Sequence, residues 1–239
     1  MEPDIQSYNQ LLSGKTPEEI ITFFTSRFPG KVAFATSLGA EDQVILSMIA
    51  SLKAEVKVFT LDTGRLFQET YDLLDLTVKK YKIPIQVQFP DAARVEEMVR
   101  SKGINLFYES VENRKLCCHI RKVEPMQRAL AGMEVWFTGL RKDQGITRKG
   151  LHIVQPDEQY HLIKVCPLVE WHPDQVWGYI REHHIPYNPL HDKGFPSIGC
   201  LPCTRAVRPG EDERSGRWWW ELPENKECGI HSPLPAAGE

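Results

Sequence analysis

The sequence predicts an α/β fold with a mostly parallel, twisted sheet flanked by helices. Over the first 150 or so residues, short apolar β-type runs alternate with stretches of helical periodicity, a pattern typical of parallel sheets with right-handed crossovers. Polar clusters follow directly on three of these runs. The length of 239 residues suits one such domain with elaborations, or at most two small domains.

The expected elements follow in chain order. Residues 5–28 are predicted to be helical, with Thr16 as a cap and Pro17 at the first helical position. The strands and helices after them are expected to alternate. Strands are predicted at 31–36, 56–61, 85–89 and 135–138, and helices from after Asp42 to about 52, at about 66–81, after Asp91 and at 119–131.

The pattern changes after about residue 150. Residues 151–154 and 160–165 flank Gln155-Pro156-Asp157-Glu158, which predicts a hairpin or paired ribbon. An amphipathic helix is expected at 173–184. Beyond it the chain is rich in proline, glycine and charge, so we predict an α/β domain over 1–204 and an irregular arm over 205–239.

Composition and charge exclude several classes of protein. Hydrophobic residues make up 41% and charged residues 26% of the chain, which are ordinary values for a globular protein. The net charge of −3 offers no global attraction to nucleic acid, and no apolar run approaches the roughly 20 residues that span a bilayer. The acidic N-terminus is unlike a secretory signal, so we expect a cytoplasmic protein without membrane or nucleic-acid partners.

Three polar clusters mark the expected ligand site. They are Ser37–Asp42, Asp62–Arg65 and Gly139–Arg148, and each follows a predicted strand. Ligands of open parallel α/β sheets bind beyond the carboxyl ends of the strands. The sequence therefore predicts a binding site where these clusters meet.

Six cysteines need an explanation, because structural disulfides are rare in the cytoplasm. The adjacent pair Cys117-Cys118 and the CxxC turn Cys200–Cys203 together supply four thiolates, the number that holds a [4Fe–4S] cluster or a tetrahedral zinc ion. The spacing favours a cluster, although the two pairs could also be unrelated. Cys166 is expected to be a buried core thiol. Cys228 is either an idle thiol or a nucleophile activated by its basic neighbours.

The motifs in their order resemble those of assimilatory adenylyl-sulfate (APS) reductases, over about residues 30–231. The resemblance rests on SLGAED at 37–42, LDTG at 61–64, CCHIRKVEP at 117–125, TGLRKDQ at 138–144, YNPLH at 187–191, SIGCLPCT at 197–204, GRWWWE at 216–221 and ECGIH at 227–231. It implies the adenine-nucleotide α-hydrolase, or PP-loop, fold. It also implies that Cys117, Cys118, Cys200 and Cys203 bind one [4Fe–4S] cluster and that Cys228 is the nucleophile.

The same resemblance implies the reaction and its partners. Cys228 would attack the sulfur of APS, release AMP and carry an S-sulfocysteine, which reduced thioredoxin would resolve to sulfite. Self-association is left open. The residues expected to bind substrate are Ser37, Gly39, Asp62, Lys122, Arg141, Arg148, Arg214 and Arg217, with His231 in a supporting role near Cys228.

Two of these assignments carry further reasoning. Lys122 comes four residues after Cys118 on an expected helix, so we predict that it links the cluster to the substrate. Asp62 could instead belong to an ordinary turn at the end of a strand.

The alternatives to APS reduction are activity on phosphoadenylyl sulfate (PAPS), a PP-loop sulfur-transfer ATPase, and a zinc-stabilised binding module. The paired cysteines favour APS, and the altered first loop disfavours ATP cleavage.

Overall fold

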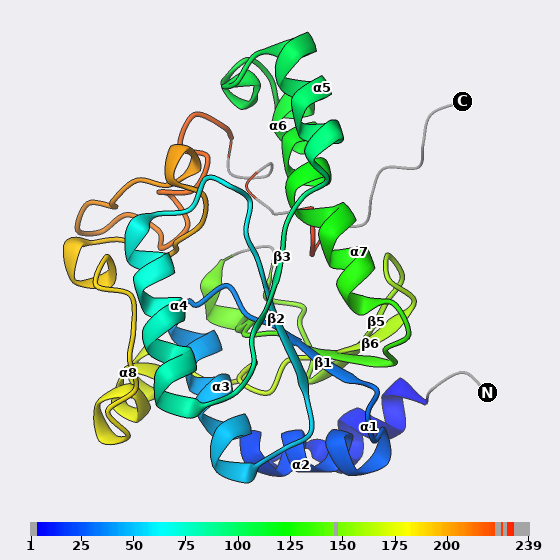
Figure 1. The fold of residues 1–239 in the computed structure, drawn as a ribbon. Helices are drawn as coiled ribbons and strands as arrows, with labels where there is room; N and C mark the ends of the chain where they lie inside the picture. The colour runs from blue at the N-terminus through cyan, green and yellow to red at the C-terminus, as the bar shows by residue number, and fades with distance from the viewer. Residues whose placement is uncertain (1–3, 146–147, 223–225, 227–228, 232–239) are drawn as a thin grey trace.

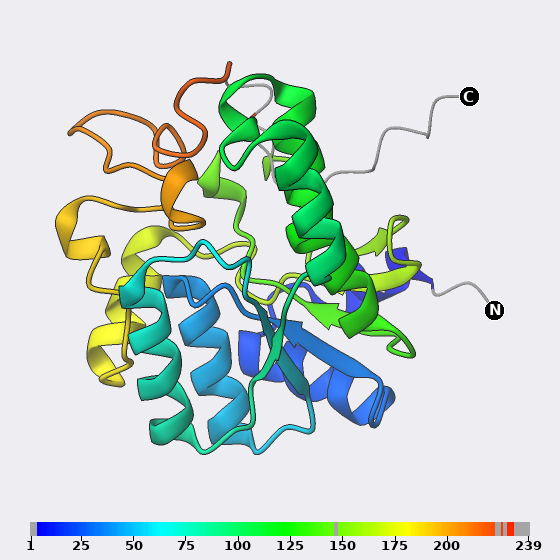
Figure 2. The ribbon, with the colours of Figure 1, turned by 45° about the horizontal axis from the view of Figure 1, so that its top comes forward.

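A computed structural model gives the structure of the chain and describes residues 4–145, 148–222, 226 and 229–231. Six strands form one sheet in the order β3-β2-β1-β4-β6-β5 (Figures 1 and 2). The chain builds outward from β1 to β3 and then crosses to the other side of β1 for β4. The order of the strands therefore reverses between β1 and β4, which is where α/β sheets of this kind bind ligands.

The strands confirm the predicted alternation. Five of them run parallel and β5 alone is antiparallel to its neighbour β6. The strands are β1 Val32–Ala35, β2 Lys57–Leu61, β3 Gln86–Gln88, β4 Val135–Phe137, β5 Val154–Asp157 and β6 Leu162–Val165. The α-helices are α1 Ile5–Leu12, α2 Pro17–Arg27, α3 Ala40–Leu52, α4 Gln68–Tyr81, α5 Ala92–Lys102, α6 Val111–Cys118, α7 Glu124–Leu130 and α8 Pro173–Glu182.

The central strands are buried on both faces because helices cover both sides of the sheet. Val32 and Phe34 of β1 pack with α2, α3 and α8, whereas Ala33 between them packs with α7 on the opposite face. Alternate residues of a strand point to opposite faces, so a strand covered on both sides must be apolar throughout. This explains why β1 (VAFA) and β4 (VWF) contain no polar residue.

The N-terminal helical stretch is broken. Helix α1 ends at Leu12, and Gly14, with a φ of +74°, allows the chain to turn. Helix α2 then begins as predicted. Thr16 accepts a hydrogen bond from the Glu19 backbone N–H, and the Glu19 carboxylate accepts one from the Thr16 N–H, which completes a capping box.

The region around the adjacent cysteines is more helical than the sequence indicated. Helix α6, which ends at Cys118, was not predicted, and the expected helix over 119–131 begins as a π-helix over His119–Val123 before α7. A π-helix inserts an extra residue into the turn and is frequent at functional sites. Its wider turn changes the direction of Lys122 relative to the α-helical spacing that we assumed.

The hairpin is real, but its turn lies later than predicted. Residues 155–157, which we expected in the turn, belong to β5, and the turn falls between Asp157 and Leu162. Pro156 lacks a backbone N–H and is tolerated because β5 is an edge strand. On the open side of β5, the Asn9 side chain from α1 donates to the Val154 carbonyl at 2.7 Å and accepts from the Val154 N–H at 3.0 Å.

In the described part of residues 205–239 the chain forms neither a helix nor a regular strand. One isolated antiparallel bridge joins Arg217 to Thr204, directly after the CxxC turn. The division of the chain at residue 204 remains a prediction.

Among the described residues, no helix has the length and apolar character that crossing a bilayer would require.

Candidate active site

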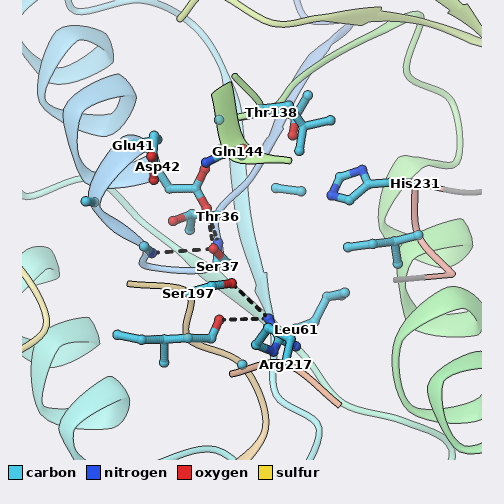
Figure 3. A pocket seen from close by; sticks show the side chains of 18 of the residues that line it. Thr36, Ser37, Glu41, Asp42, Leu61, Thr138, Gln144, Ser197, Arg217 and His231 are labelled. Carbon is cyan, nitrogen blue, oxygen red and sulfur yellow. Dashed lines mark hydrogen bonds between the residues drawn. The ribbon is translucent and has the colours of Figure 1, made fainter. Parts of the chain in front are cut away.

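A pocket lies at the reversal point of the sheet, beyond the carboxyl ends of β1, β2 and β4 (Figure 3). All three predicted polar clusters contribute to it. Ser37 and Gly39 come from the loop after β1, Thr63 from the loop after β2, and Gln144 and Arg148 from the segment after β4. The sheet thus brings together residues that lie more than 100 positions apart in the chain.

The first loop is held by a buried carboxylate. The Asp42 side chain accepts hydrogen bonds from the Ser37 backbone N–H and hydroxyl, both at 2.6 Å, and Leu38 takes a left-handed φ of +61°. Burial raises the pKa of Asp42 to about 6, although the hydrogen bonds from Ser37 oppose that shift. Gly39 is the N-cap of α3, so the backbone N–H groups of the first helical turn face the pocket end of the loop.

The loops after β1 and β4 touch closely at Gly139. A Cβ atom at Gly139 would lie 2.4 Å from Asp42 Oδ1 and 3.3 Å from the Asp42 backbone nitrogen. Real Cβ atoms do not approach a neighbouring atom at 2.4 Å, so this position requires glycine. The narrow contact fixes the distance between the two loops that form one wall of the pocket.

Four of the predicted cationic residues line the pocket. Arg148 donates to the Gln144 side chain, and Arg214 donates to the Lys226 carbonyl at 2.9 Å. Arg217 is buried, and its guanidinium contacts the Ile198 carbonyl at 3.4 Å. Lys122, from the π-helix, completes the set of lining cations Lys122, Arg148, Arg214 and Arg217. This group can balance the charge of an anionic ligand, and each arginine offers a planar fork suited to phosphate or sulfate.

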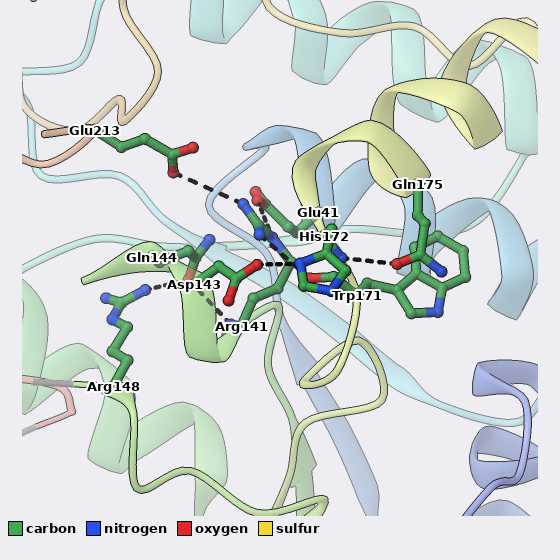
Figure 4. A network of polar contacts seen from close by, with 9 residues as sticks. All are labelled: Glu41, Arg141, Asp143, Gln144, Arg148, Trp171, His172, Gln175 and Glu213. Carbon is green, nitrogen blue, oxygen red and sulfur yellow. Dashed lines mark hydrogen bonds and ion pairs between the residues drawn. The ribbon is translucent and has the colours of Figure 1, made fainter. Parts of the chain in front are cut away.

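Arg141 belongs to a different arrangement (Figure 4). It does not line the pocket with the other cations. Its buried guanidinium contacts Glu41 at 2.8 Å, Glu213 at 3.7 Å and the Trp171 carbonyl at 3.3 Å. These contacts join the loop after β4 to the start of α3 and to the arm, so the structure gives Arg141 a tethering position outside this pocket.

Asp62 also lies outside the pocket lining. Its carboxylate accepts hydrogen bonds from the Gly64 N–H at 2.7 Å and from the Tyr71 hydroxyl at 2.8 Å. The Asp62 side chain therefore holds the turn after β2, which is the role of an ordinary strand-end turn residue that we gave as the alternative to substrate binding. The neighbouring Thr63 reaches the pocket in its place.

The two cysteine pairs meet in space. All four thiols are buried in one apolar cluster at the ends of α6 and of the CxxC turn, packed with Phe107, Met98 and Trp218. The Thr63 hydroxyl lies 3.2 Å from Cys200 Sγ, which connects this cluster to the pocket. Within the described ranges, no group of three or more His, Cys, Asp or Glu side chains has the arrangement of a site for one metal ion.

The electrostatics differ among these thiols. Burial raises the pKa of Cys117, and it raises that of Cys203 to about 12. Burial also acts on Cys200, but the Lys122 ammonium, the Thr63 hydroxyl and two nearby arginines together outweigh it and lower the pKa of that thiol. Lys122 thus faces both the cysteines and the pocket.

Of the remaining two cysteines, Cys166 lies in the described part of the chain and Cys228 does not. Cys166 is fully buried beside Leu140 and Val169, as expected of a core thiol. Cys228, the predicted nucleophile, lies outside the described residues. His231 and Ile230, which follow it in the sequence, line the pocket.

Sequence reasoning missed several lining residues. Trp136 comes from the middle of β4, where a buried aromatic residue looks like ordinary core. His191 was assigned no role, yet it lines the pocket, burial lowers its pKa, and its Nε2 has no hydrogen-bond partner among the described residues. The signal for His191 was its place in the YNPLH motif, and Ser197, also missed, begins the SIGCLPCT motif.

A pocket at the reversal point of a parallel sheet, with cations and a helix N-terminus on its walls, defines an α/β protein with a site suited to an anionic ligand. Comparison with known proteins narrows this class. The family model for the phosphoadenosine phosphosulfate reductase domain matches residues 31–206. The chain therefore belongs to that family.

Individual relatives agree with this assignment. The chain is 48% identical over 213 residues to the adenosine 5′-phosphosulfate reductase of Burkholderia cepacia, covering 87% of this chain and 85% of the relative. It also resembles the solved phosphoadenylyl-sulfate reductase of Candida auris in a phosphate complex, with a TM-score of 0.74, 31% identity, and coverage of 87% of this chain and 98% of that one. The Candida glabrata FMN adenylyltransferase shares the fold alone, at a TM-score of 0.57 and 16% identity over 99% of this chain and 81% of that one. The predicted PP-loop fold is confirmed.

Proposed function

We propose that this chain is an APS reductase, which reduces adenosine 5′-phosphosulfate to sulfite and AMP in sulfate assimilation. The observation that carries the proposal is the pocket at the sheet reversal, where four cations converge beside the segment that follows Cys228. Relatives at close to half identity over most of both chains are APS reductases by name.

The pocket suits the nucleotide's 5′ group. Backbone N–H groups at the start of α3 are placed to donate to phosphate oxygens, beside the loop that Ser37 and Asp42 hold together. Arg148, Arg214 and Arg217 would neutralise the phosphate and sulfate. The solved Candida auris relative was obtained as a phosphate complex, which supports an anion site in this fold.

The chemistry assigned to Cys228 proceeds in two transfers. Its thiolate attacks the sulfur of APS, the S–O bond to the phosphate breaks, and AMP leaves with the bonding electrons. An S-sulfocysteine remains. A thiolate of reduced thioredoxin then attacks Sγ of Cys228, sulfite departs with the S–S electrons, and the second thioredoxin thiol resolves the mixed disulfide. The cations of the pocket stabilise the negative charge that gathers on the departing phosphate.

The four buried cysteines fit a [4Fe–4S] cluster as cofactor. Thiolates are the ligands that iron–sulfur clusters take, and Cys117, Cys118, Cys200 and Cys203 are the buried thiols gathered beside the pocket. When bound, the cluster would supply structural support and a local charge at this end of the pocket. Lys122 faces both the thiols and the pocket, so its ammonium would couple that charge to the substrate.

Intact mass after incubation with APS tests the proposed nucleophile. The wild type should gain a sulfite-sized adduct, and Cys228→Ser should not. Cys166→Ala is the matched control, because its buried thiol does not line the pocket, and it should form the adduct normally. An adduct that persists in Cys228→Ser would refute the mechanism. Loss of the adduct on treatment with reduced thioredoxin tests the second transfer.

The cofactor and the substrate are tested separately. Iron and acid-labile sulfide in the anaerobically purified protein, with a visible absorption band, support the cluster, whereas colourless zinc would contradict it. PAPS is the second candidate substrate, because the solved relative at 31% identity is a PAPS reductase by name. Assays of both nucleotides side by side decide between them, and a strong preference for PAPS would overturn the choice of APS.

A further inference from the structure

The turn between β5 and β6 contacts the C-terminal segment Gly229–His231. Gln159 in this turn donates a hydrogen bond from Nε2 to the Gly229 carbonyl at 3.1 Å. The same amide nitrogen also lies 2.8 Å from the Tyr160 hydroxyl, which holds the side chain in place. The bond to Gly229 joins residues 70 positions apart, and Gln159 belongs to none of the motifs we assigned.

Trp136 provides a second contact with the same segment. Its ring lies nearly parallel to that of His231, with 10° between the planes and 5.7 Å between the centroids. Both side chains line the pocket, and His231 lies on the opposite side of it from Asp42 (Figure 3). The stacked pair therefore stands at the boundary between the C-terminal segment and the ligand site.

A buried polar network fixes the orientation of Trp136. Its indole N–H donates to Asp157 Oδ2 at 3.1 Å, and the Lys164 ammonium contacts the same carboxylate at 2.9 Å. Both charged groups are buried. The Asp157 carboxylate belongs to β5, and its two partners, Trp136 and Lys164, belong to β4 and β6. The ring of Trp136 is therefore anchored by three adjacent strands of the sheet.

The opposite side of the segment meets the region of the cysteines. Ile230 packs against both the apolar cluster that holds the four cysteines and the one formed by α7 with the sheet, and a Cβ at Gly229 would lie 3.4 Å from Val123 Cγ2, at the end of the π-helix. The segment is thus enclosed between the β5–β6 turn and the helix that carries Cys117 and Cys118.

We infer that Gln159 and Trp136 form a seat that positions the chain directly after Cys228 at the edge of the pocket. Gln159 is a positioning residue, since it acts through the backbone of Gly229 and lines no part of the pocket. The inference rests on the proposed function in one respect, because it takes Cys228 as the nucleophile. A seat at Gly229 would raise the fraction of time that the thiol spends within reach of the substrate sulfur.

Substitutions at Gln159 test the seat without disturbing the core, because this side chain is half-buried at a turn. Gln159→Ala removes the hydrogen bond, and Gln159→Glu keeps the size of the side chain while replacing its donor with an acceptor. Gln155→Ala is the matched control: it removes the same residue type from neighbouring β5. Equal thermal midpoints and circular dichroism spectra of the variants establish that each is folded.

The first readout needs no turnover. We expect hydrogen exchange in the peptide that contains residues 229–231, measured in the full chain without nucleotide, to accelerate about 3- to 10-fold in both Gln159 variants, the effect of losing one hydrogen bond. The Gln155→Ala control should match the wild type. Unchanged exchange in both Gln159 variants would refute the seat, whatever the enzyme's activity proves to be.

The second readout is catalytic. Single-turnover formation of the S-sulfo adduct and kcat should fall about 3- to 10-fold in both Gln159 variants, while KM for APS changes less than about 2-fold. A matching rise in KM with constant kcat would mean that Gln159 affects substrate binding and would overturn the positioning role. A wild type that forms no adduct would refute the proposed function, and the exchange measurement would still decide on the seat.

Discussion

Replacing Glu221 should release the arm from the body of the protein. Glu221 and Arg114 form a buried, two-pronged ion pair, with Nε–Oε1 at 2.9 Å and Nη2–Oε2 at 2.7 Å, and both side chains are no more than 2% exposed. The Arg114 guanidinium also lies 4.7 Å from the ring centroid of Trp218. The pair therefore joins helix α6, which ends in the cysteine pair, to the arm.

The cost of breaking this pair follows from the burial of both charges. Glu221→Ala leaves the Arg114 charge in a site with little water, which costs about 3–5 kcal/mol, whereas the intact pair roughly balances its own desolvation. Glu221→Gln keeps the shape of the side chain and should cost less, on the order of 1–3 kcal/mol. The arm forms no regular secondary structure in its described part, so we expect this cost to appear first as local opening.

Hydrogen exchange of the peptide that contains Trp218–Trp220 measures that opening. A penalty of 3–5 kcal/mol corresponds to an increase of about 10²–10⁴-fold in exchange for Glu221→Ala, up to the limit set by the arm's own stability. Glu97→Gln is the control, because its ion pair with Arg100 is exposed and should be worth less than about 1 kcal/mol.

A double variant tests whether the penalty arises from leaving one charge of the pair buried. Arg114→Met combined with Glu221→Met removes both charges, so exchange should return most of the way to the wild-type rate. The reasoning would be refuted if Glu221→Ala exchanged at the wild-type rate, or if the double variant opened as readily as the single one.

Three further predictions concern single residues. Gly139→Ala should weaken AMP binding about 10- to 100-fold by calorimetry, because its Cβ would collide with Asp42, whereas Gly150→Ala, which has open space around it, should bind normally. Burial raises the pKa of Cys166 to about 12, so about 10⁻⁴ of this thiol is ionised at pH 8; peptide mapping should find it unalkylated in the folded protein and alkylated in urea, and labelling of the folded protein would contradict its burial. The pKa of Asp42 is raised from 3.8 to about 6, so the folded state binds a proton between about pH 4 and 6 that the unfolded state does not, and stability should fall by about 3 kcal/mol as pH rises through that window. Denaturation curves of Asp42→Asn should lack this contribution, and a wild-type-minus-variant difference that is constant with pH would refute it.

Local periodicity was sufficient for most of the fold. The apolar runs and the Thr16 cap act over a few residues, so each could be identified alone. The π-helix after Cys118 could not, because it depends on tertiary packing that no spacing rule contains. The hairpin turn was misplaced for a related reason: Pro156 usually breaks strands, and only the edge position of β5 makes it acceptable.

The candidate site was predicted best where chain topology decides it. The loops after β1 and β4 had to meet because the strands are parallel neighbours, so Ser37, Gly39 and Arg148 reach the pocket as expected. Arg141 and Asp62 differ because their partners, Glu41 and Tyr71, are set by side-chain geometry. A charged residue in a polar loop looks the same in sequence whether it binds a ligand or a neighbouring side chain.

The β5 edge bears on self-association. At this edge Pro156 has no N–H to offer, and the Asn9 amide occupies both the N–H and the carbonyl of Val154. An incoming strand would find too few free donors and acceptors to continue the ladder, so the sheet is protected there against edge-to-edge growth. Any dimer of this chain should therefore use side-chain surfaces and not a sheet extended through β5.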